Sequence, residues 1–267
     1  MQESPSNARG RSRLHGKKAL VTAGAQGIGL AISRALAAGG CDVYVHFRHS
    51  REAAEAFRRE AIAGGRRAAC AGADLTEAEE CARIVAGAVG FLGGIDILVN
   101  NAGSLVARRP FGEADDDYWA EVMSLNLGSA RRVTRAAVPH LVSAAASGGG
   151  ASIVNISSLA GRQGGGPGAL AYATAKGAML TFTRGLASEL GPQGVRVNAV
   201  APGLILGSSF HATHTPQDAQ ERIIAGIPLR RAGTTDDVAR AVVFLAGEFD
   251  GFISGATLDI NGGVYCA

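Results

Sequence analysis

The chain has 267 residues, 47% of them hydrophobic, which is enough to bury the core of one α/β domain or of two smaller ones. Its formal charge is only +3 and its basic residues are scattered, which argues against a nucleic-acid partner. No apolar run reaches the roughly 18 residues of a membrane span, and the four cysteines have neither C-x-x-C nor metal-ligand spacing. We therefore expect no membrane span, no metal site, and free thiols in a reducing, cytoplasmic compartment.

The N-terminal part predicts a strand, a glycine-rich turn and a helix. Residues 1–14 are polar and predict a disordered lead-in, so the domain is expected to cover residues 15–267. An apolar run at 19–22 is followed by glycines within 24–29 and then by apolar residues at helical spacing. A helix that begins at such a turn offers unpaired N–H groups to a pyrophosphate, and glycines allow a close approach. This order of elements predicts a dinucleotide site.

Alternating strands and helices continue to the end of the chain. Further apolar runs predict strands near residues 43–47, 67–72, 95–99, 152–156, 195–200 and 256–260. Strands that alternate with helices form a parallel sheet with right-handed crossovers. The strands at 19–22 and 95–99 are then expected to flank the point where strand order reverses and a ligand crevice opens.

Several helix ends and loops have signals of their own. We expect Ser50, Thr76 and Thr234 to cap the helices that follow them. Pro139 is expected to kink or divide the long helix in the middle of the chain. The polar stretch within residues 204–227 has little apolar periodicity and is interpreted as a mobile lid.

Tyr172 and Lys176 stand four residues apart, so a helix would place both side chains on one face. A phenol has an ordinary pKa near 10, and a nearby cation lowers it by favouring the phenolate. Arginine supplies nearly every other cation of the chain, so a lysine here indicates a need for a compact ammonium. The pair predicts a general acid or base for a carbonyl or alcohol. The alternative is an exposed tyrosine packed on a lysine stem.

Seven motifs in family-like order and spacing resemble the short-chain dehydrogenases/reductases in their single-domain form, from about Lys17 to Gly263. The motifs are Thr22-Ala-Gly-Ala-Gln-Gly-Ile-Gly29, Asp74, Asn100-Asn-Ala-Gly103, Asn126, Ser158, Tyr172-x-x-x-Lys176 and Pro202-Gly203. The resemblance implies one α/β domain with a doubly wound, seven-stranded parallel sheet, the Rossmann fold, in a homo-oligomer (tetramer or dimer). It also implies hydride transfer between a nicotinamide cofactor and a carbonyl or secondary alcohol. Overall, the chain is similar to 3-oxoacyl-carrier-protein reductases and their relatives.

The resemblance assigns roles to four residues. Ser158 would hold the substrate oxygen, and Tyr172 would be the general acid in reduction. Lys176 would hold the nicotinamide ribose and lower the tyrosine pKa, while Asn126 would kink its helix and hold a water. The residues expected to bind the cofactor are Thr22, Gly24, Gln26, Gly27, Ile28, Gly29, Arg48, Asp74, Leu75, Asn101, Ala102, Gly103, Tyr172, Lys176, Pro202, Gly203 and Ile205.

Three features depart from the family pattern. Ala23 stands where glycine is usual; at positive φ it would cost about 1 kcal/mol, and we expect Gly24 to absorb the turn instead. Gly207 stands near the place of a threonine that bonds the nicotinamide amide. The loop between Ser158 and Tyr172 is one residue longer than usual.

The end of the second strand indicates the cofactor. NAD-binding relatives place an aspartate there, but this chain has Phe47, followed by Arg48 and Arg51. A guanidinium suits the 2′-phosphate of NADP through charge-assisted hydrogen bonds. NADP(H) is therefore favoured, with NAD(H) as the alternative if Arg48 is an ordinary surface arginine.

The substrate is less constrained by the sequence. Carrier proteins are acidic, and reductases that dock them carry basic residues beside the site. Residues 141–156 contain no Lys or Arg, and Ser188 stands where an arginine would help. We therefore favour a free small-molecule ketone, aldehyde or secondary alcohol over a carrier-bound 3-oxoacyl thioester. A non-catalytic, cofactor-sensing regulator is disfavoured, because Tyr172 and Lys176 are both present.

Overall fold

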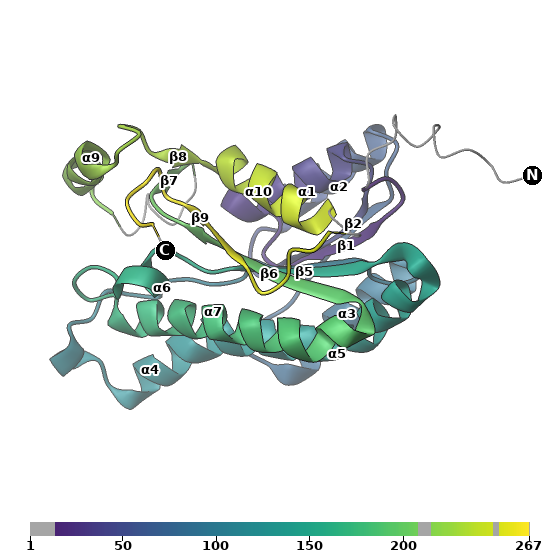
Figure 1. Ribbon diagram of the computed structural model, residues 1–267, viewed down its shortest axis with the longest axis horizontal. Helices are drawn as coiled ribbons and strands as arrows, with labels where there is room; N and C mark the ends of the chain where they lie inside the picture. Colours follow the sequence, from purple (N-terminus) through teal and green to yellow (C-terminus); the bar gives the residue numbers. More distant parts are fainter. Residues whose placement is uncertain (1–13, 208–214, 248–250, 267) are drawn as a thin grey trace, which may run out of the picture.

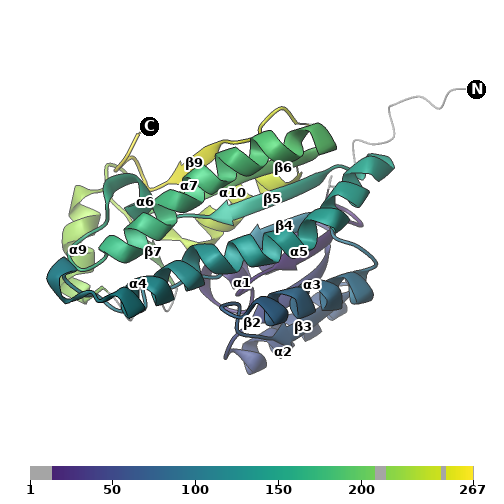
Figure 2. The ribbon, with the colours of Figure 1, turned by 90° about the horizontal axis from the view of Figure 1, so that it is seen from below.

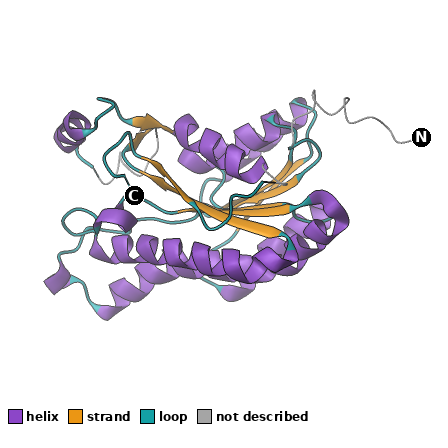
Figure 3. Cartoon of the chain, viewed as in Figure 1, coloured by secondary structure: helices purple, strands orange, loops and turns teal. Residues whose placement is uncertain are grey.

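A seven-stranded sheet forms the centre of the computed structural model, which describes residues 14–207, 215–247 and 251–266. Its strands run in the order β3-β2-β1-β4-β5-β6-β9, with helices over both faces (Figures 1 and 3). Every neighbouring pair of these strands is parallel. The doubly wound α/β sheet expected from the sequence is therefore confirmed.

The strands of this sheet are β1 (Lys18–Val21), β2 (Asp42–Phe47), β3 (Ala68–Gly72), β4 (Ile97–Asn100), β5 (Ala151–Ile156), β6 (Val195–Pro202) and β9 (Thr257–Ile260). Two short strands pair with each other, β7 (Ile205–Leu206) and β8 (Gly233–Thr234). The α-helices are α1 (Gly27–Ala38), α2 (Arg51–Ala63), α3 (Ala78–Leu92), α4 (Asp116–Met123), α5 (Ser129–Ala144), α6 (Ala160–Gln163), α7 (Leu170–Leu190), α9 (Gln217–Gly226) and α10 (Thr235–Gly247). Within the described ranges, none of these helices combines the length and apolarity needed to cross a bilayer.

Alternating side chains of the strands contribute to two cores, one on each face of the sheet. In β1, Ala19 and Val21 belong to the core under α1, α2 and α10, whereas Leu20 belongs to the core under α3, α5 and α7. All three side chains are fully buried. Figure 2 shows α3, α5 and α7 laid across the second face. A side-chain period of two explains how one short apolar run serves both layers.

Strand order reverses between β1 and β4, which are neighbours in the sheet although β2 and β3 come between them in sequence. Val21 at the end of β1 pairs with Val45 of β2 on one side and with Val99 of β4 on the other. The loops that leave the carboxyl ends of β1 and β4 therefore diverge and open a crevice. The two strands expected to flank the crevice do so.

The long helix around Pro139 is divided, but not by the proline. α4 passes into a π-helical segment, Ser124–Gly128, before α5 begins, and α5 continues unbroken through Pro139. A second π-helical segment, Ala145–Gly149, follows α5. One proline removes a single N–H donor, and the packed face of α5 holds the helix together around it. The division falls instead at Asn126, which is fully buried in the first π segment.

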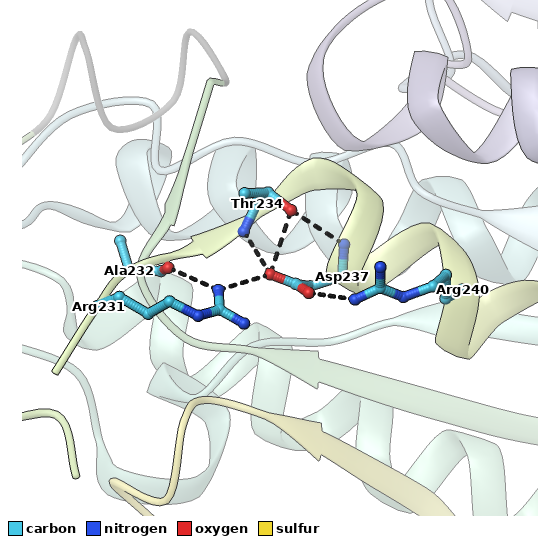
Figure 4. A network of polar contacts seen from close by, with 5 residues as sticks. All are labelled: Arg231, Ala232, Thr234, Asp237 and Arg240. Carbon is cyan, nitrogen blue, oxygen red and sulfur yellow. Dashed lines mark hydrogen bonds and ion pairs between the residues drawn. The ribbon is translucent and has the colours of Figure 1, made fainter. Parts of the chain in front are cut away.

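Only one of the three expected N-caps is found. Thr234 Oγ1 accepts from the N–H of Asp237 at 3.2 Å, and Asp237 Oδ2 accepts from the N–H of Thr234 at 2.9 Å (Figure 4). This reciprocal capping box begins α10. Ser50 donates its hydroxyl hydrogen to a side chain of the glycine-rich turn instead of capping α2. Thr76 donates to the Asp74 carboxylate from both its N–H and its hydroxyl, so it does not cap α3.

The expected lid contains more regular structure than its composition predicted. β7 and α9 both lie within residues 204–227, and residues 208–214 lie outside the described residues. No side chain of α9 is buried, so the helix lies on the surface (Figure 1). A helix without a buried stripe has weak apolar periodicity, which is why the pattern did not reveal it. The mobility of the lid stays a prediction.

Candidate active site

The turn after β1 takes its shape from an alanine. Ala23 has φ +47°, in the left-handed region, and its N–H donates to His46 Nδ1 at 3.1 Å. The expectation that Gly24 would absorb the turn is wrong, because the φ of Gly24 is not positive. Gly24 instead provides space, since a Cβ there would lie 2.8 Å from Ser33 Oγ. Gly29 is tighter still: its Cβ would lie 2.1 Å from the carbonyl oxygen of Ala23.

The loops after β1 and β4 are bound to each other across the crevice. Thr22 Oγ1 accepts from the N–H groups of Asn101 and Ala102, at 2.9 and 3.0 Å. Asn101 Nδ2 donates to the carbonyl oxygens of Thr22 and Ala23, both at 3.1 Å. These four bonds fix the two loops relative to each other. The Thr22 hydroxyl, expected to serve the cofactor, is engaged within the protein.

A cavity of about 270 Å³ opens beside these loops. The expected cofactor residues that line it are Gln26, Arg48, Asp74, Leu75, Ala102 and Gly103. The expected cofactor residues outside its lining are Thr22, Gly24, Gly27, Ile28, Gly29, Asn101, Tyr172, Lys176, Pro202, Gly203 and Ile205. Sequence reasoning missed the lining residues Ala25, His46, His49, Ser50, Ala73, Ser104 and Leu125. Ala25 lies within the glycine-rich motif, and the others stand near a residue that the sequence singled out, as Ser104 does beside Gly103 and Ala73 beside Asp74.

Two charged side chains meet at this cavity. Arg48 Nη2 lies 2.7 Å from Asp74 Oδ2. Hydrogen bonds from Thr76 are the main cause that holds the pKa of Asp74 below its ordinary value, and Arg48 adds to them. Arg51 does not line the cavity; its guanidinium lies 5.7 Å from the ring centroid of Phe47, which is itself buried. A fixed carboxylate and a neighbouring guanidinium are therefore both available to a polar ligand.

Tyr172, Ser158 and Lys176 come together at the ends of β5 and the start of α7. The hydroxyls of Tyr172 and Ser158 share a hydrogen bond. Lys176 Nζ donates to the carbonyl oxygen of Ile156 at 2.9 Å and lies 5.8 Å from the centroid of the Tyr172 ring. Tyr172 is 9% exposed and Lys176 is 3% exposed, so the tyrosine is not the exposed residue of the alternative interpretation. The structure thus joins three of the four predicted catalytic residues.

Burial sets the protonation of this group. It raises the pKa of Tyr172 to about 12, although the hydrogen bond from Ser158 opposes the change. It also lowers the pKa of Lys176 to about 8. Burial is the largest cause of the change at Tyr172, so the tyrosine is a protonated phenol at neutral pH. The lowering of its pKa by Lys176, expected with the help of a cationic cofactor ring, stays a prediction.

Asn126 supports this site from the π segment. Its Nδ2 donates to the carbonyl oxygens of Ser104 and Val122, at 2.8 and 2.9 Å, and its Oδ1 accepts from the N–H of Ser104 at 3.1 Å. A Cβ on Gly103 would lie 2.6 Å from Asn126 Oδ1 and 3.0 Å from Lys176 Nζ. Asn126 therefore holds the loop after β4 against the lysine. The water that it is expected to hold stays a prediction.

Among the residues that the structure describes, no group of three or more His, Cys, Asp or Glu side chains is arranged to hold a metal ion.

A family model described as enoyl-(acyl carrier protein) reductase matches residues 22–265. The chain belongs to the short-chain dehydrogenase/reductase family. The resemblance inferred from the motifs is confirmed, and this short-chain dehydrogenase/reductase is an NAD(P)-dependent oxidoreductase.

Similar proteins cover nearly the whole of this short-chain dehydrogenase/reductase. An uncharacterized oxidoreductase of Mycobacterium tuberculosis is 39% identical over 252 residues, 94% of this chain and 93% of its own. The acetoacetyl-CoA reductase of Allochromatium vinosum is 37% identical over 248 residues, 92% of this chain and 98% of its own. A 3-oxoacyl-[acyl-carrier-protein] reductase of Staphylococcus aureus is 33% identical over 249 residues, 93% of this chain and 98% of its own.

Solved structures of similar proteins include both cofactor types. The NADH-dependent reductase A1-R′, responsible for alginate metabolism, has a TM-score of 0.88 at 34% identity and covers 96% of this chain and 100% of its own. A blue fluorescent protein from a metagenomic library, in complex with NADPH, has a TM-score of 0.87 at 35% identity and covers 95% of this chain and 100% of its own. A nicotinamide cofactor is therefore supported for this short-chain dehydrogenase/reductase.

The segment after β6 departs from the pattern of the family in a way that the backbone explains. A side chain at Gly203 would be tightly crowded, because its Cβ would lie 3.0 Å from Asn261 Cβ. Gly207, in place of the usual threonine, has φ +82°, a conformation that glycine adopts without strain. The carbonyl oxygen of Pro202 accepts from the N–H of Leu159 at 2.8 Å, which ties this segment to the residues after β5.

Proposed function

We propose that this protein is an NADPH-dependent reductase of a free small-molecule ketone or aldehyde, with the oxidation of a secondary alcohol as the reverse reaction. The hydrogen bond between the Tyr172 and Ser158 hydroxyls, beside the buried Lys176, is the observation that carries the proposal. This hydrogen bond holds the two hydroxyls side by side, so that one carbonyl oxygen of a substrate can accept from both. NAD(H) is the alternative cofactor.

The residues at the crevice fit a dinucleotide. α1 begins without a side-chain cap and without an acidic residue in its first turn, so its N–H groups and its positive end suit a pyrophosphate. Asp74 would accept from the adenine amine and Arg48 would bind a 2′-phosphate, and both residues line the same cavity. Lys176 would hold the nicotinamide ribose. When bound, the reduced cofactor supplies the hydride.

The protein's own part in reduction is to move one proton and to hold one oxygen. Ser158 donates to the carbonyl oxygen and fixes its position. Tyr172, a protonated phenol at neutral pH, gives its proton to the same oxygen. The ammonium of Lys176 stabilises the phenolate that remains. Asn126 acts on this step indirectly, by holding the loop after β4 beside Lys176.

A free substrate is favoured over a carrier-bound one. Residues 141–156 contain no Lys or Arg and position 188 is a serine, so neither place offers a basic side chain that would attract an acidic carrier protein. The similarity to an acetoacetyl-CoA reductase and to a 3-oxoacyl-carrier-protein reductase supports reduction of an acyl thioester as the second candidate. A homo-oligomer, a cytoplasmic location and a lid over the substrate belong to the same proposal.

The test is to follow the oxidation of NADPH and NADH against ketones, aldehydes, quinones, acyl-CoA thioesters and acyl-carrier thioesters. We expect turnover of a free ketone or aldehyde, and loss of that turnover in Tyr172→Phe. Turnover of thioesters alone would support the second candidate. Turnover that is unchanged in Tyr172→Phe would refute the proposed chemistry.

A further inference from the structure

His46 joins two walls of the cofactor cavity. It lies in β2 with 2% of its surface exposed. Its Nδ1 accepts from the N–H of Ala23, and its Nε2 lies 3.1 Å from the carbonyl oxygen of Ala73. Its own carbonyl oxygen accepts from the N–H of Gly24 at 2.9 Å. The turn after β1 and the loop after β3 are therefore both held by one residue.

The two ring contacts specify one form of the histidine. A carbonyl oxygen can only accept, so Nε2 carries the hydrogen toward Ala73. A backbone N–H can only donate, so Nδ1 is unprotonated toward Ala23. His46 is thus neutral and a hydrogen-bond acceptor in the fold. A second proton would occupy Nδ1 and set two donors against each other, which would break the bond to Ala23.

Ala23 is the residue that needs this bond. Its φ of +47° crowds a side chain against its own backbone, a cost that glycine does not have. Both of its peptide groups are held from outside: His46 accepts from its N–H, and Asn101 Nδ2 donates to its carbonyl oxygen. The Ala23 carbonyl oxygen is also the atom nearest to the position that a Cβ would take at Gly29 of helix α1. The conformation of Ala23 therefore sets the distance between the turn and the start of α1.

We propose that His46 is a positioning residue that holds Ala23 in its left-handed conformation and fixes the cofactor cavity, and that protonation of His46 weakens cofactor binding. The binding part rests on the proposed function, because it assumes that this cavity takes the cofactor. The positioning part does not. Ala23, His46 and Ala73 all line the cavity, and Asp74 follows Ala73 directly.

The surroundings of His46 agree with a neutral ring that protonates in acid. Burial lowers its pKa below the ordinary value, while the Ala73 carbonyl opposes the change. Asp74, from the loop after β3, and Glu80, from α3, favour the proton, whereas Arg83 of α3 disfavours it. The side of the glycine-rich turn presents the backbone N–H groups of Ala23 and Gly24. Protonation is therefore expected below the ordinary range of a histidine.

The first experiment is a double-mutant cycle between positions 23 and 46, measured as the thermal unfolding of the protein alone and as the Kd of NADP⁺ by calorimetry. We expect His46→Leu to raise the Kd about two- to tenfold, the range of one net hydrogen bond. When His46→Leu is introduced into the Ala23→Gly variant, the change in log Kd should be less than about half of the change in the wild type. Glycine adopts the conformation of the turn without the hydrogen bond from position 23 to His46. An equal effect in both backgrounds would overturn the positioning role.

The second experiment uses His46→Asn, whose Oδ1 can replace Nδ1 as an acceptor but cannot be protonated. It should restore most of the affinity lost in His46→Leu, and its Kd should respond to pH less than that of the wild type between neutral pH and about two pH units below the ordinary histidine pKa of about 6.5. The 2′-phosphate itself titrates near pH 6, so NAD⁺ is measured in parallel. Equal pH responses of wild type and His46→Asn with NAD⁺ would overturn the role of protonation.

The two proposals fail in different ways. Absence of binding of either cofactor to the wild type would contradict the proposed function, yet coupling in the unfolding midpoints would still support the positioning of Ala23 by His46. If His46→Leu does not fold, His46→Phe, which also lacks the acceptor but keeps a ring, takes its place in the cycle with Ala23→Gly. Additive midpoints in that cycle would overturn the positioning role, because Phe removes the acceptor that Ala23 is proposed to need.

Discussion

Arg48 and Asp74 form an ion pair with 2.7 Å between Nη2 and Oδ2, so the cation proposed to bind the 2′-phosphate is held by the anion proposed to bind the adenine. The two side chains are 52% and 34% exposed, and such a pair contributes only about 0–1 kcal/mol. A phosphate that carries nearly two charges can therefore recruit Arg48 without a large penalty. The pair keeps Arg48 at the cavity until the phosphate arrives.

Arg48→Ala is expected to lower kcat/KM for NADPH roughly ten- to over a hundredfold, since a hydrogen bond to a charged group contributes about 1.5–3 kcal/mol. NADH lacks the phosphate, so its kcat/KM should change little. Both cofactors are compared at one ionic strength, because salt screens the contact. Arg51→Ala is the matched control and should affect both cofactors equally. Equal losses for NADPH and NADH in Arg48→Ala would rule out the assignment of NADPH.

Tyr172→Phe should reduce turnover by about 10²–10⁴-fold, the usual contribution of a general acid. The cofactor Kd should change by no more than about twofold, because the ring and its packing against Leu105 and Tyr118 remain. Burial raises the pKa of Tyr172 to about 12, so the acid form is present throughout the neutral range. Alcohol oxidation needs the phenolate, and its kcat/KM should rise with pH while that of reduction does not. A kcat/KM for oxidation that falls as pH rises would contradict the role of the Tyr172 phenolate as the base.

Gly161→Ala should destabilise the protein by about 1–3 kcal/mol, the usual cost of overpacking. The new Cβ would lie 2.6 Å from the carbonyl carbon of Lys176 and 2.7 Å from the nitrogen of Gly177, and a helix backbone cannot move aside as a side chain can. Activity should fall as well, because Lys176 is displaced. Gly185→Ala, in α7 and with open space around it, should instead stabilise by about 0.5–1 kcal/mol. Denaturant unfolding of the two variants provides the comparison.

Asp237→Ala should destabilise α10 by about 1 kcal/mol, the usual value of an N-terminal cap. The carboxylate accepts from both donors of Thr234 and from Arg231 and Arg240 (Figure 4). The bond from Arg231 is the main cause that lowers the pKa of Asp237 to about 2. The ionised form is thus favoured by folding, and its contribution is present above the ordinary pKa near 4 and lost as pH falls toward 2.

The unfolding midpoints of wild type and Asp237→Ala should therefore differ by a constant amount above about pH 4 and converge below it. Arg240→Ala removes a partner that is 74% exposed and should be nearly neutral. A difference that persists unchanged toward pH 2 would show that the effect comes from packing rather than from the carboxylate.

Much of the fold was predictable because each strand is a short apolar run and each crossover is a helix. The strands that end near Val21 and Val99 were expected to flank the crevice, and the structure pairs them as neighbours in the sheet. The proximity of Tyr172 and Lys176 was likewise predictable, because one helical turn fixes two side chains on one face. Ser158 could be placed from its position at the end of a strand.

What the sequence did not reveal depends on contacts between distant segments. The left-handed conformation of Ala23 depends on His46, which in the sequence is only a polar residue inside an apolar strand. Thr76 was expected to cap a helix, but the Asp74 carboxylate two residues earlier competes for its donors. The resemblance indicated a kink at Asn126, but the residues alone did not reveal the π segment, because the side-chain bonds to Ser104 that accompany it come from a different loop.

The hydrogen bond between Ala23 and His46 also constrains how this sequence can change. A side chain at position 23 is tolerated where an acceptor already stands at position 46, whereas glycine at 23 is tolerated with either kind of residue at 46. An apolar residue at position 46 is therefore expected to cost more stability when position 23 is alanine than when it is glycine. Among relatives, residues other than glycine at position 23 should occur together with a side-chain acceptor at position 46.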